Sequence, residues 1–95
     1  MKFKLTRKAK SDLDDIWNYT QIRWGAEQAD IYIDILYNRF LWLTRNPSLW
    51  RQRDDIVEGL YSYHESSHII FFRRYDKGIE IVRILHGRMD VQRHL

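Results

Sequence analysis

Residues 60–86 read LYSYHESSHIIFFRRYDKGIEIVRILH, and apolar side chains recur along this stretch with a period close to two. A period of two is typical of β-strands, because successive side chains point to opposite faces of a sheet. It predicts strands over Leu60–His64, His68–Tyr75 and Ile79–His86. The connections between them are short and rich in turn residues, so we expect the three strands to be antiparallel neighbours.

The middle strand of this group carries the run Ile69-Ile70-Phe71-Phe72, which is apolar on both faces. A strand of this kind is buried on both sides. We therefore expect it to be central in the sheet, with helices on one face and another part of the chain on the other.

The segments before the strands have the period of helices instead. Apolar side chains fall at intervals of three and four residues over 8–24 and over 26–45, which predicts two helices. Gly25 separates them, and Asn46-Pro47 ends the second. A connection this short makes an antiparallel helical hairpin. The alternation over Lys2–Thr6 predicts one more strand.

The predicted order β-α-α-β-β-β indicates an α+β fold, in which an antiparallel sheet carries an N-terminal helical hairpin on one face. We expect one domain over residues 1–95, ending in a helical turn capped by Asp90. The residues expected in the core are Leu13, Trp17, Ile33, Leu36, Phe40, Ile70, Phe72 and Ile81.

Charge is distributed in blocks along the 95 residues, whose formal net charge is +3. Residues 1–10 carry only basic charges, 11–34 are mainly acidic, and 35–53 carry only arginines. A protein that binds nucleic acid along its surface is usually more uniformly basic, so we expect no stable direct binding to nucleic acid. A local basic site or an acidic partner fits the blocks, as does a simple role in solubility.

The composition excludes several classes of site. The chain has no cysteine, which rules out disulfides, thiolate zinc sites and cysteine catalysis. No stretch approaches the length of a membrane span and no signal-peptide pattern opens the chain, so we expect a cytoplasmic protein that is not bound to a membrane. His64 and His68 could meet across a turn, but two histidines in strands are a weak metal signal, and we expect no metal or cofactor.

Arginine and histidine gather near the end of the predicted sheet. Arg73 and Arg83 lie in adjacent strands, and His86, Arg88 and Arg93 follow them. Arginines that hold phosphate, together with a histidine that moves a proton, are the groups that a metal-free ribonuclease uses. The alternative is that these arginines are solvated or paired with nearby acids.

Several segments together resemble a known family. They are Leu13-Asp14-Asp15-Ile16, Trp24-Gly25 with Gln28-Ala29, Gly59–Tyr63, His68–Arg73 and Ile81–Asp90. They are collinear with the bacterial ParE toxins of the RelE/ParE superfamily, and the block that ends in Leu85-His86-Gly87-Arg88-Met89-Asp90 is the most specific. The resemblance implies the toxin half of a type II toxin–antitoxin module, with the fold described above and a ParD-like or related acidic antitoxin as partner.

The superfamily divides by target. RelE-type members cleave messenger RNA on the ribosome, commonly with strand arginines or lysines and a C-terminal Tyr or His-Tyr pair, whereas ParE-type members bind and block DNA gyrase. Here no tyrosine follows Tyr75, and Gly87 follows His86. The resemblance therefore favours gyrase inhibition without catalysis, with target contacts at Arg83, His86, Arg88 and Arg93. The alternative is a ribosome-dependent endoribonuclease that uses Arg73, Arg83, His86 and Arg88.

An antitoxin that folds onto the toxin would need apolar anchors. We expect Ile31, Ile35, Trp42 and Trp50 to supply them, because aromatic and large apolar side chains dominate binding energy. In the alternative these residues complete the core of a small domain. That alternative applies more to the two isoleucines than to Trp50, which lies in the connecting segment.

Overall fold

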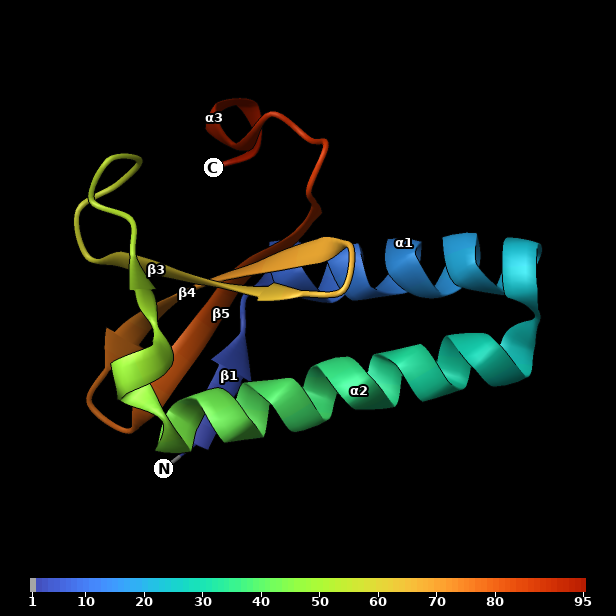
Figure 1. Ribbon diagram of the computed structural model, residues 1–95, viewed down its shortest axis with the longest axis horizontal. Coiled ribbons are helices and arrows are strands. Elements are labelled where there is room, and N and C mark those ends of the chain that lie inside the picture. Colours follow the sequence, from blue (N-terminus) through green and yellow to red (C-terminus); the bar gives the residue numbers. More distant parts are fainter. Residues whose placement is uncertain (1) are drawn as a thin grey trace.

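The computed structural model describes residues 2–95. Its elements, in chain order, are β1 (Lys2–Leu5), α1 (Arg7–Trp24), α2 (Ala26–Arg45), the 3-10 turn η1 (Pro47–Leu49), β2 (Arg51–Gln52), β3 (Leu60–Glu65), β4 (His68–Tyr75), β5 (Gly78–His86) and α3 (Val91–His94). The two long helices form a hairpin that lies against the sheet and projects beyond it (Figure 1). The predicted α+β fold with a helical hairpin on the sheet is confirmed.

The five strands form one sheet in the order β1-β5-β4-β3-β2. Strands β3, β4 and β5 are antiparallel neighbours, as predicted, and β4 is central. Strand β1 pairs with β5 in parallel, so the sheet is mixed rather than wholly antiparallel. The sequence did not predict β2, because its two exposed polar residues show no alternation.

Local signals explain the ends of the helices. Thr6 is the N-cap of α1, and its hydroxyl accepts a hydrogen bond from the backbone N–H of Ala9 at 3.0 Å. Gly25 ends α1 with a φ of 96°, a conformation that glycine adopts without strain. Asn46 ends α2, and Pro47 follows it.

The core between the helices and the sheet contains most of the residues predicted for it. Leu13, Leu36, Phe40, Ile70, Phe72 and Ile81 are all buried. Trp17 and Ile33 are only partly buried, which corrects the prediction. The indole N–H of Trp17 donates to the carboxylate of Asp30 in α2 at 2.8 Å, in an exposed hydrogen bond between the two helices. Ile33 packs at the margin of the core.

The opposite face of the sheet has a smaller core of Leu60, Phe71 and Leu85. Ile56, from the segment before β3, and Val91, from α3, pack against it. This confirms that β4 is covered on both faces. Asp90 caps α3 as predicted, because its carboxylate accepts from the backbone N–H of Gln92 at 3.1 Å.

None of the helices formed by residues 2–95 is both long and apolar enough to cross a membrane.

Candidate functional site

Beyond the end of β1, the edge of β5 forms hydrogen bonds with side chains from α1 and its N-cap. Strand β1 pairs only with the first part of β5, and the backbone of β5 continues past it. The hydroxyl of Thr6 donates to the carbonyl of Val82 at 2.8 Å, and the carboxylate of Asp12 accepts from the backbone N–H of Ile84 at 2.9 Å. These two polar side chains therefore form hydrogen bonds with backbone groups of β5 that β1 does not reach.

Asp12 also binds Arg83 at two points. Nε of Arg83 donates to Oδ2 at 2.8 Å, and Nη2 donates to Oδ1 at 2.7 Å. The remaining nitrogen, Nη1, donates to the backbone carbonyl of His94 in α3. The hydrogen bonds that Arg83 donates to Asp12 raise the pKa of Arg83 further above its ordinary value. Arg83 thus links α1, β5 and the C-terminal turn, and its charge is neutralised.

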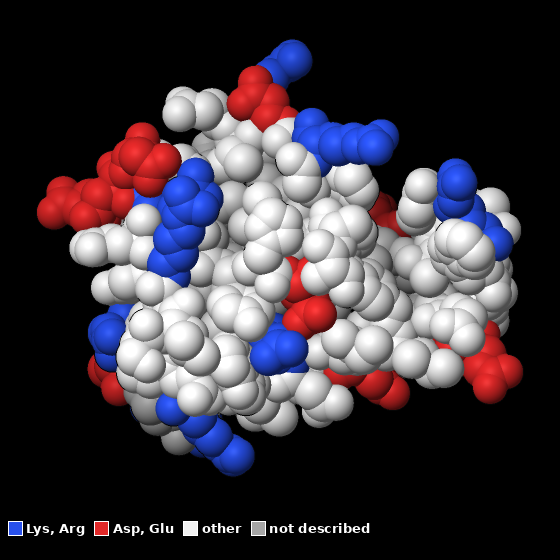
Figure 2. Space-filling view, in the orientation of Figure 1, with Lys and Arg blue, Asp and Glu red and all other residues white. Residues whose placement is uncertain are grey.

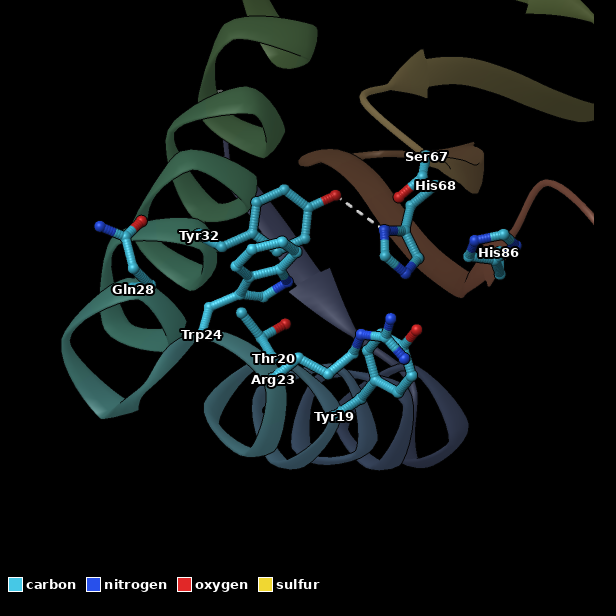
Figure 3. Close-up of a pocket in the computed structure, with 9 residues that line it drawn as sticks. All are labelled: Tyr19, Thr20, Arg23, Trp24, Gln28, Tyr32, Ser67, His68 and His86. Atoms are coloured by element: carbon cyan, nitrogen blue, oxygen red, sulfur yellow. Dashed lines mark hydrogen bonds between the residues drawn. The ribbon is translucent and has the colours of Figure 1, made fainter.

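A groove lies between the helical hairpin and the ends of β4 and β5. One part has a volume of about 450 Å³ and lies among the residues drawn in Figure 3, namely Tyr19, Thr20, Arg23, Trp24, Gln28, Tyr32, Ser67, His68 and His86. The adjoining part, of about 380 Å³, shares Tyr19, His68 and His86 and continues toward Arg88 and Met89. This groove brings together the two histidines that the register pairs across β4 and β5.

His68 is held between the helices and the sheet. Its Nδ1 is hydrogen-bonded to the hydroxyl of Tyr32 at 2.7 Å, as the dashed line in Figure 3 marks, and its ring lies edge-on to that of His86 with the centroids 5.5 Å apart. Burial and, to a smaller extent, the nearby His86 lower the pKa of His68 to about 4, against a smaller opposing effect of Asp12. His68 is therefore neutral at physiological pH.

His86 and Arg88 lie together at the end of β5. The backbone N–H of Arg88 donates to Nδ1 of His86 at 3.2 Å, and both residues line the same part of the groove. The side chain of Arg88 is exposed. This pair was predicted to share a site, and the structure brings the two residues together.

The other predicted basic residues lie elsewhere. Arg73 and Arg83 line a separate pocket of about 110 Å³ near the chain end, and Arg93 is exposed on α3. The four residues of the ribonuclease alternative are therefore divided between two pockets.

The predicted antitoxin anchors differ in exposure. Ile31 and Ile35 are exposed on α2, and Trp42 is half-buried, with its ring 5.2 Å from that of Tyr63. Trp50 is only 9% exposed. It packs on Phe72, and its indole N–H donates to the carbonyl of Leu43 at 2.8 Å, so it belongs to the core and offers little area to a partner.

Figure 2 shows the surface on the side seen in Figure 1. Many basic and acidic side chains lie toward its margins, others meet near its centre, and the areas between them are uncharged. One ion pair on the helical side joins Arg39 of α2 to Glu65 of β3, with Nε and Oε1 2.6 Å apart. The guanidinium of Arg39 also stacks on Trp42, 4.5 Å from the ring centroid. The pair fixes α2 beside the edge of β3.

Sequence reasoning missed several residues of the groove. Tyr32 carried no signal beyond helical periodicity, and Trp24 entered only through the resemblance to a family. A carboxylate such as Asp12 near a helix start has an ordinary local explanation, so it was not predicted to belong to the site. His68 was paired with His64, but the register places Ile69 opposite His64 and places His86 opposite His68. The second pairing depends on a register shift between Phe71 and Phe72, because regular counting from the Tyr75–Gly78 pair would place Leu85 opposite His68. Within residues 2–95, no group of three or more metal-ligating side chains is present.

Two solved structures have the same arrangement of helices and strands. The chain superposes on a chain of the "Chromosomal ParDE TA system from P. aeruginosa" with a TM-score of 0.76 and 27% identity, covering 90% of this chain and 95% of that one. It also superposes on a chain of the toxin–antitoxin complex RelBE2 from Mycobacterium tuberculosis with a TM-score of 0.60. That second match is only 16% identical, covers 88% of this chain and 94% of that one, and shows the fold alone. The fold is that of small toxins found in such systems.

Sequence comparison defines the family more narrowly. The family described as "ParE toxin of type II toxin-antitoxin system, parDE" matches residues 3–91. Toxin ParE1 of Caulobacter vibrioides is 36% identical over 98% of this chain and 96% of its own length. Toxin ParE1 of Mycobacterium tuberculosis is 37% identical over 99% of this chain and 97% of its own length. The chain therefore belongs to the family of ParE toxins of type II toxin–antitoxin systems, as the resemblance implied.

Proposed function

We propose that this toxin inhibits DNA gyrase by binding to it, and that an acidic antitoxin neutralises the toxin. The observation that carries the choice of target is the state of the candidate catalytic groups. A metal-free ribonuclease needs one group that accepts a proton, another that donates one, and cations beside the phosphate. The arginines and histidines of this chain do not provide this combination.

The arginines do not converge on one phosphate position. Arg83 is bound by the carboxylate of Asp12 at two points. Arg73 lines the same pocket as Arg83 and does not line the groove that contains His86. A guanidinium already neutralised in this way contributes little to the stabilisation of a transition-state charge.

The two histidines of the groove are also poorly suited to proton transfer. The imidazole nearest to His86 is that of His68, whose pKa is about 4. At neutral pH such a group is an uncharged imidazole, which is a poor general acid and a weak base. The absence of tyrosine after Tyr75 points the same way. These features support a toxin that acts through a contact surface.

The proposed contact surface is the end of β5 and the chain beyond it. His86, Arg88 and Arg93 supply accessible polar and basic groups there. Arg83 positions this surface, because its hydrogen bond to the carbonyl of His94 holds α3 in place. We assign contact with the target to Arg88 and Arg93, and positioning to Arg83. The proposed target puts the protein in the bacterial cytoplasm.

The proposed antitoxin surface is the exposed stripe of α2. Ile31, Ile35 and Trp42 lie on one side of this helix, and Ile35, Asn38, Arg39 and Trp42 line a shallow pocket of about 270 Å³. An amphipathic partner helix could bury its apolar face there. The blocks of basic charge at residues 1–10 and 35–53 favour a partner that is acidic.

The test of target uses two assays on the same purified toxin. We expect it to block supercoiling by gyrase and to leave ribosome-bound messenger RNA intact. Arg88→Ala combined with Arg93→Ala should weaken gyrase inhibition, whereas Arg45→Ala, an exposed arginine on α2, should not. Cleavage of the message by the parent, lost in His86→Ala, would establish the ribonuclease alternative and refute the proposal.

A further inference from the structure

The larger part of the groove, with a volume of about 450 Å³, has a distinctive lining. Its size lies within the roughly 300–1,000 Å³ typical of small-molecule sites. Among the described residues that line it there is no carboxylate, although 13 of the 95 residues of the chain are acidic. Arg23 supplies a cation, and it belongs to none of the ion pairs found among residues 2–95. The lining therefore favours an anion.

The walls of the same pocket are aromatic and accessible. Trp24 is 69% exposed and Tyr19 is 59% exposed, although both are large rings in a small domain. The guanidinium of Arg23 lies over the ring of Tyr19, 5.3 Å from its centroid. Figure 3 shows the ring of His68 reaching from the sheet toward the space bordered by the helical side chains. Exposed aromatic faces beside an arginine provide a stacking platform for a planar ring.

Neutral polar groups complete the pocket. Gln28 lies at the margin of this lining, and Figure 3 shows its amide directed away from the other labelled side chains. Ser67 and Tyr32 add hydroxyl groups, and the two imidazoles lie opposite the helices. Among the carboxylates nearby, Glu65 acts on the pKa of Tyr32 but is paired with Arg39. In the adjoining part of the groove, Asp12 is neutralised by Arg83 and Asp15 lies at the exposed margin. They do not line the larger part.

We infer that this pocket binds a nucleoside monophosphate, with the base stacked on Trp24 and the phosphate beside Arg23, Ser67 and the imidazoles. A planar ring and an anion on one small molecule match the two properties of the lining. The same chemistry is present in a free nucleotide and in the terminal nucleotide of a single strand. This inference goes beyond gyrase inhibition and does not depend on it.

The test measures binding to the full-length toxin by calorimetry and by backbone NMR shifts, with adenosine monophosphate as the probe. We expect binding in the range of about 0.1–1 mM, with shifts at the pocket residues and weaker binding of adenosine and of inorganic phosphate. Arg23→Ala should weaken binding of the monophosphate about tenfold. Arg51→Ala, which removes an equally exposed arginine from β2, should leave it unchanged.

A second variant tests the stacking part. Trp24→Leu should weaken binding of adenosine monophosphate and leave binding of inorganic phosphate unchanged, and it removes no buried contact. A 5′-phosphorylated single-stranded deoxyoligonucleotide separates the two sources: equal affinity supports a free nucleotide, and tighter binding with shifts in the same pocket supports a strand end.

Four outcomes would overturn the inference. One is no binding of the monophosphate at about 10 mM. The second is equal binding of inorganic phosphate, which would make the pocket an anion site only. The third is an equal loss in Arg23→Ala and Arg51→Ala, which would indicate general charge attraction. The fourth is a response of the pocket residues to polyglutamate but not to the nucleotide, which would assign the pocket to an acidic peptide.

Discussion

Arg83 of β5 and Asp12 of α1, 71 positions apart in the sequence, form an ion pair through two parallel hydrogen bonds of 2.7 and 2.8 Å. Their side chains are 13% and 9% exposed. The same carboxylate accepts the backbone N–H of Ile84, and the same guanidinium donates to the carbonyl of His94. The pair therefore fixes the first helix, the last strand and the C-terminal turn to one another.

Removal of the acidic partner should be costly. Asp12→Ala leaves a buried guanidinium unpaired and the N–H of Ile84 without its acceptor, so we expect a loss of about 3 kcal/mol in the free energy of unfolding. Asp14→Ala is the matched control, because Asp14 is an exposed residue of the same helix. It should change stability by less than about 0.5 kcal/mol. Urea unfolding of the two variants measures both, and equal stabilities would mean that the pair has no net effect.

Glycine at position 78 should be required for the parallel pairing of β1. A Cβ atom at Gly78 would lie 1.7 Å from the carbonyl oxygen of Lys2, so a side chain there must push β1 away from β5. Gly78→Ala should lower the free energy of unfolding by more than about 2 kcal/mol. At Gly87 the nearest atom to an added Cβ is 3.6 Å away. Gly87→Ala should therefore be nearly neutral. Hydrogen exchange at Thr6, whose backbone N–H donates to the carbonyl of Ile81 in β5 at 3.0 Å, should increase only in the Gly78 variant.

Local pattern was enough to predict most of the fold. The helices and the strands β3, β4 and β5 follow from periodicity and turn chemistry, because each element contains enough residues to express its period. The parallel direction of β1 could not be read in this way. It depends on which strand edge is free once the β3–β4–β5 meander has formed, and that edge belongs to β5.

The candidate site was less predictable, because its contacts join distant segments. The carboxylate of Asp12 has an ordinary local meaning near a helix start, and its partner lies beyond two helices and three strands. Tyr32 meets His68 only because the hairpin passes over the end of β4. Alternation along a strand places the neighbouring residues Arg73 and Arg74 on opposite faces, and in the structure Arg74 lies over Trp50 while Arg73 lines a pocket near the chain end.

Stability should fall in mild acid because of His68. Its folded-state pKa of about 4 is below the ordinary value of 6.5, so the unfolded chain binds the proton more tightly. The stabilisation is complete above pH 6.5 and is lost as the pH falls from 6.5 toward 4. Because the ring is partly solvated, we expect a loss of about 1–2 kcal/mol from this group over that range.

The matched variants for this prediction are His68→Gln and His64→Gln. The first should flatten the dependence of unfolding free energy on pH between 6.5 and 4. The second removes an exposed histidine of β3 and should leave the slope as it is in the parent. If the His68 variant keeps the full slope, another group is responsible for the acid sensitivity.

Trp50 should act on folding rather than on the partner. Its ring packs 5.1 Å from the rings of both Tyr61 and Phe72, and its N–H bonds the end of α2. Trp50→Ala should lower the free energy of unfolding by about 3–5 kcal/mol, through the cavity it leaves. A small loss in the free energy of unfolding, measured by chemical denaturation, together with a large loss of antitoxin affinity would instead assign Trp50 to the antitoxin surface.

The α2 stripe can be tested for antitoxin binding with two substitutions of the same kind. Ile35 and Leu41 are both on α2 and are 42% and 44% exposed, so aspartate at either position costs a similar amount of helix stability. A separation of six positions places the two side chains on different sides of the helix. Ile35→Asp puts a charge in the proposed apolar contact and opposite an acidic partner, so antitoxin affinity should fall by about 100-fold. Leu41→Asp should reduce it by less than about threefold. Surface plasmon resonance with the antitoxin measures both affinities, and thermal unfolding checks that the two toxins are equally folded. Equal affinities would move the antitoxin surface away from Ile31, Ile35 and Trp42.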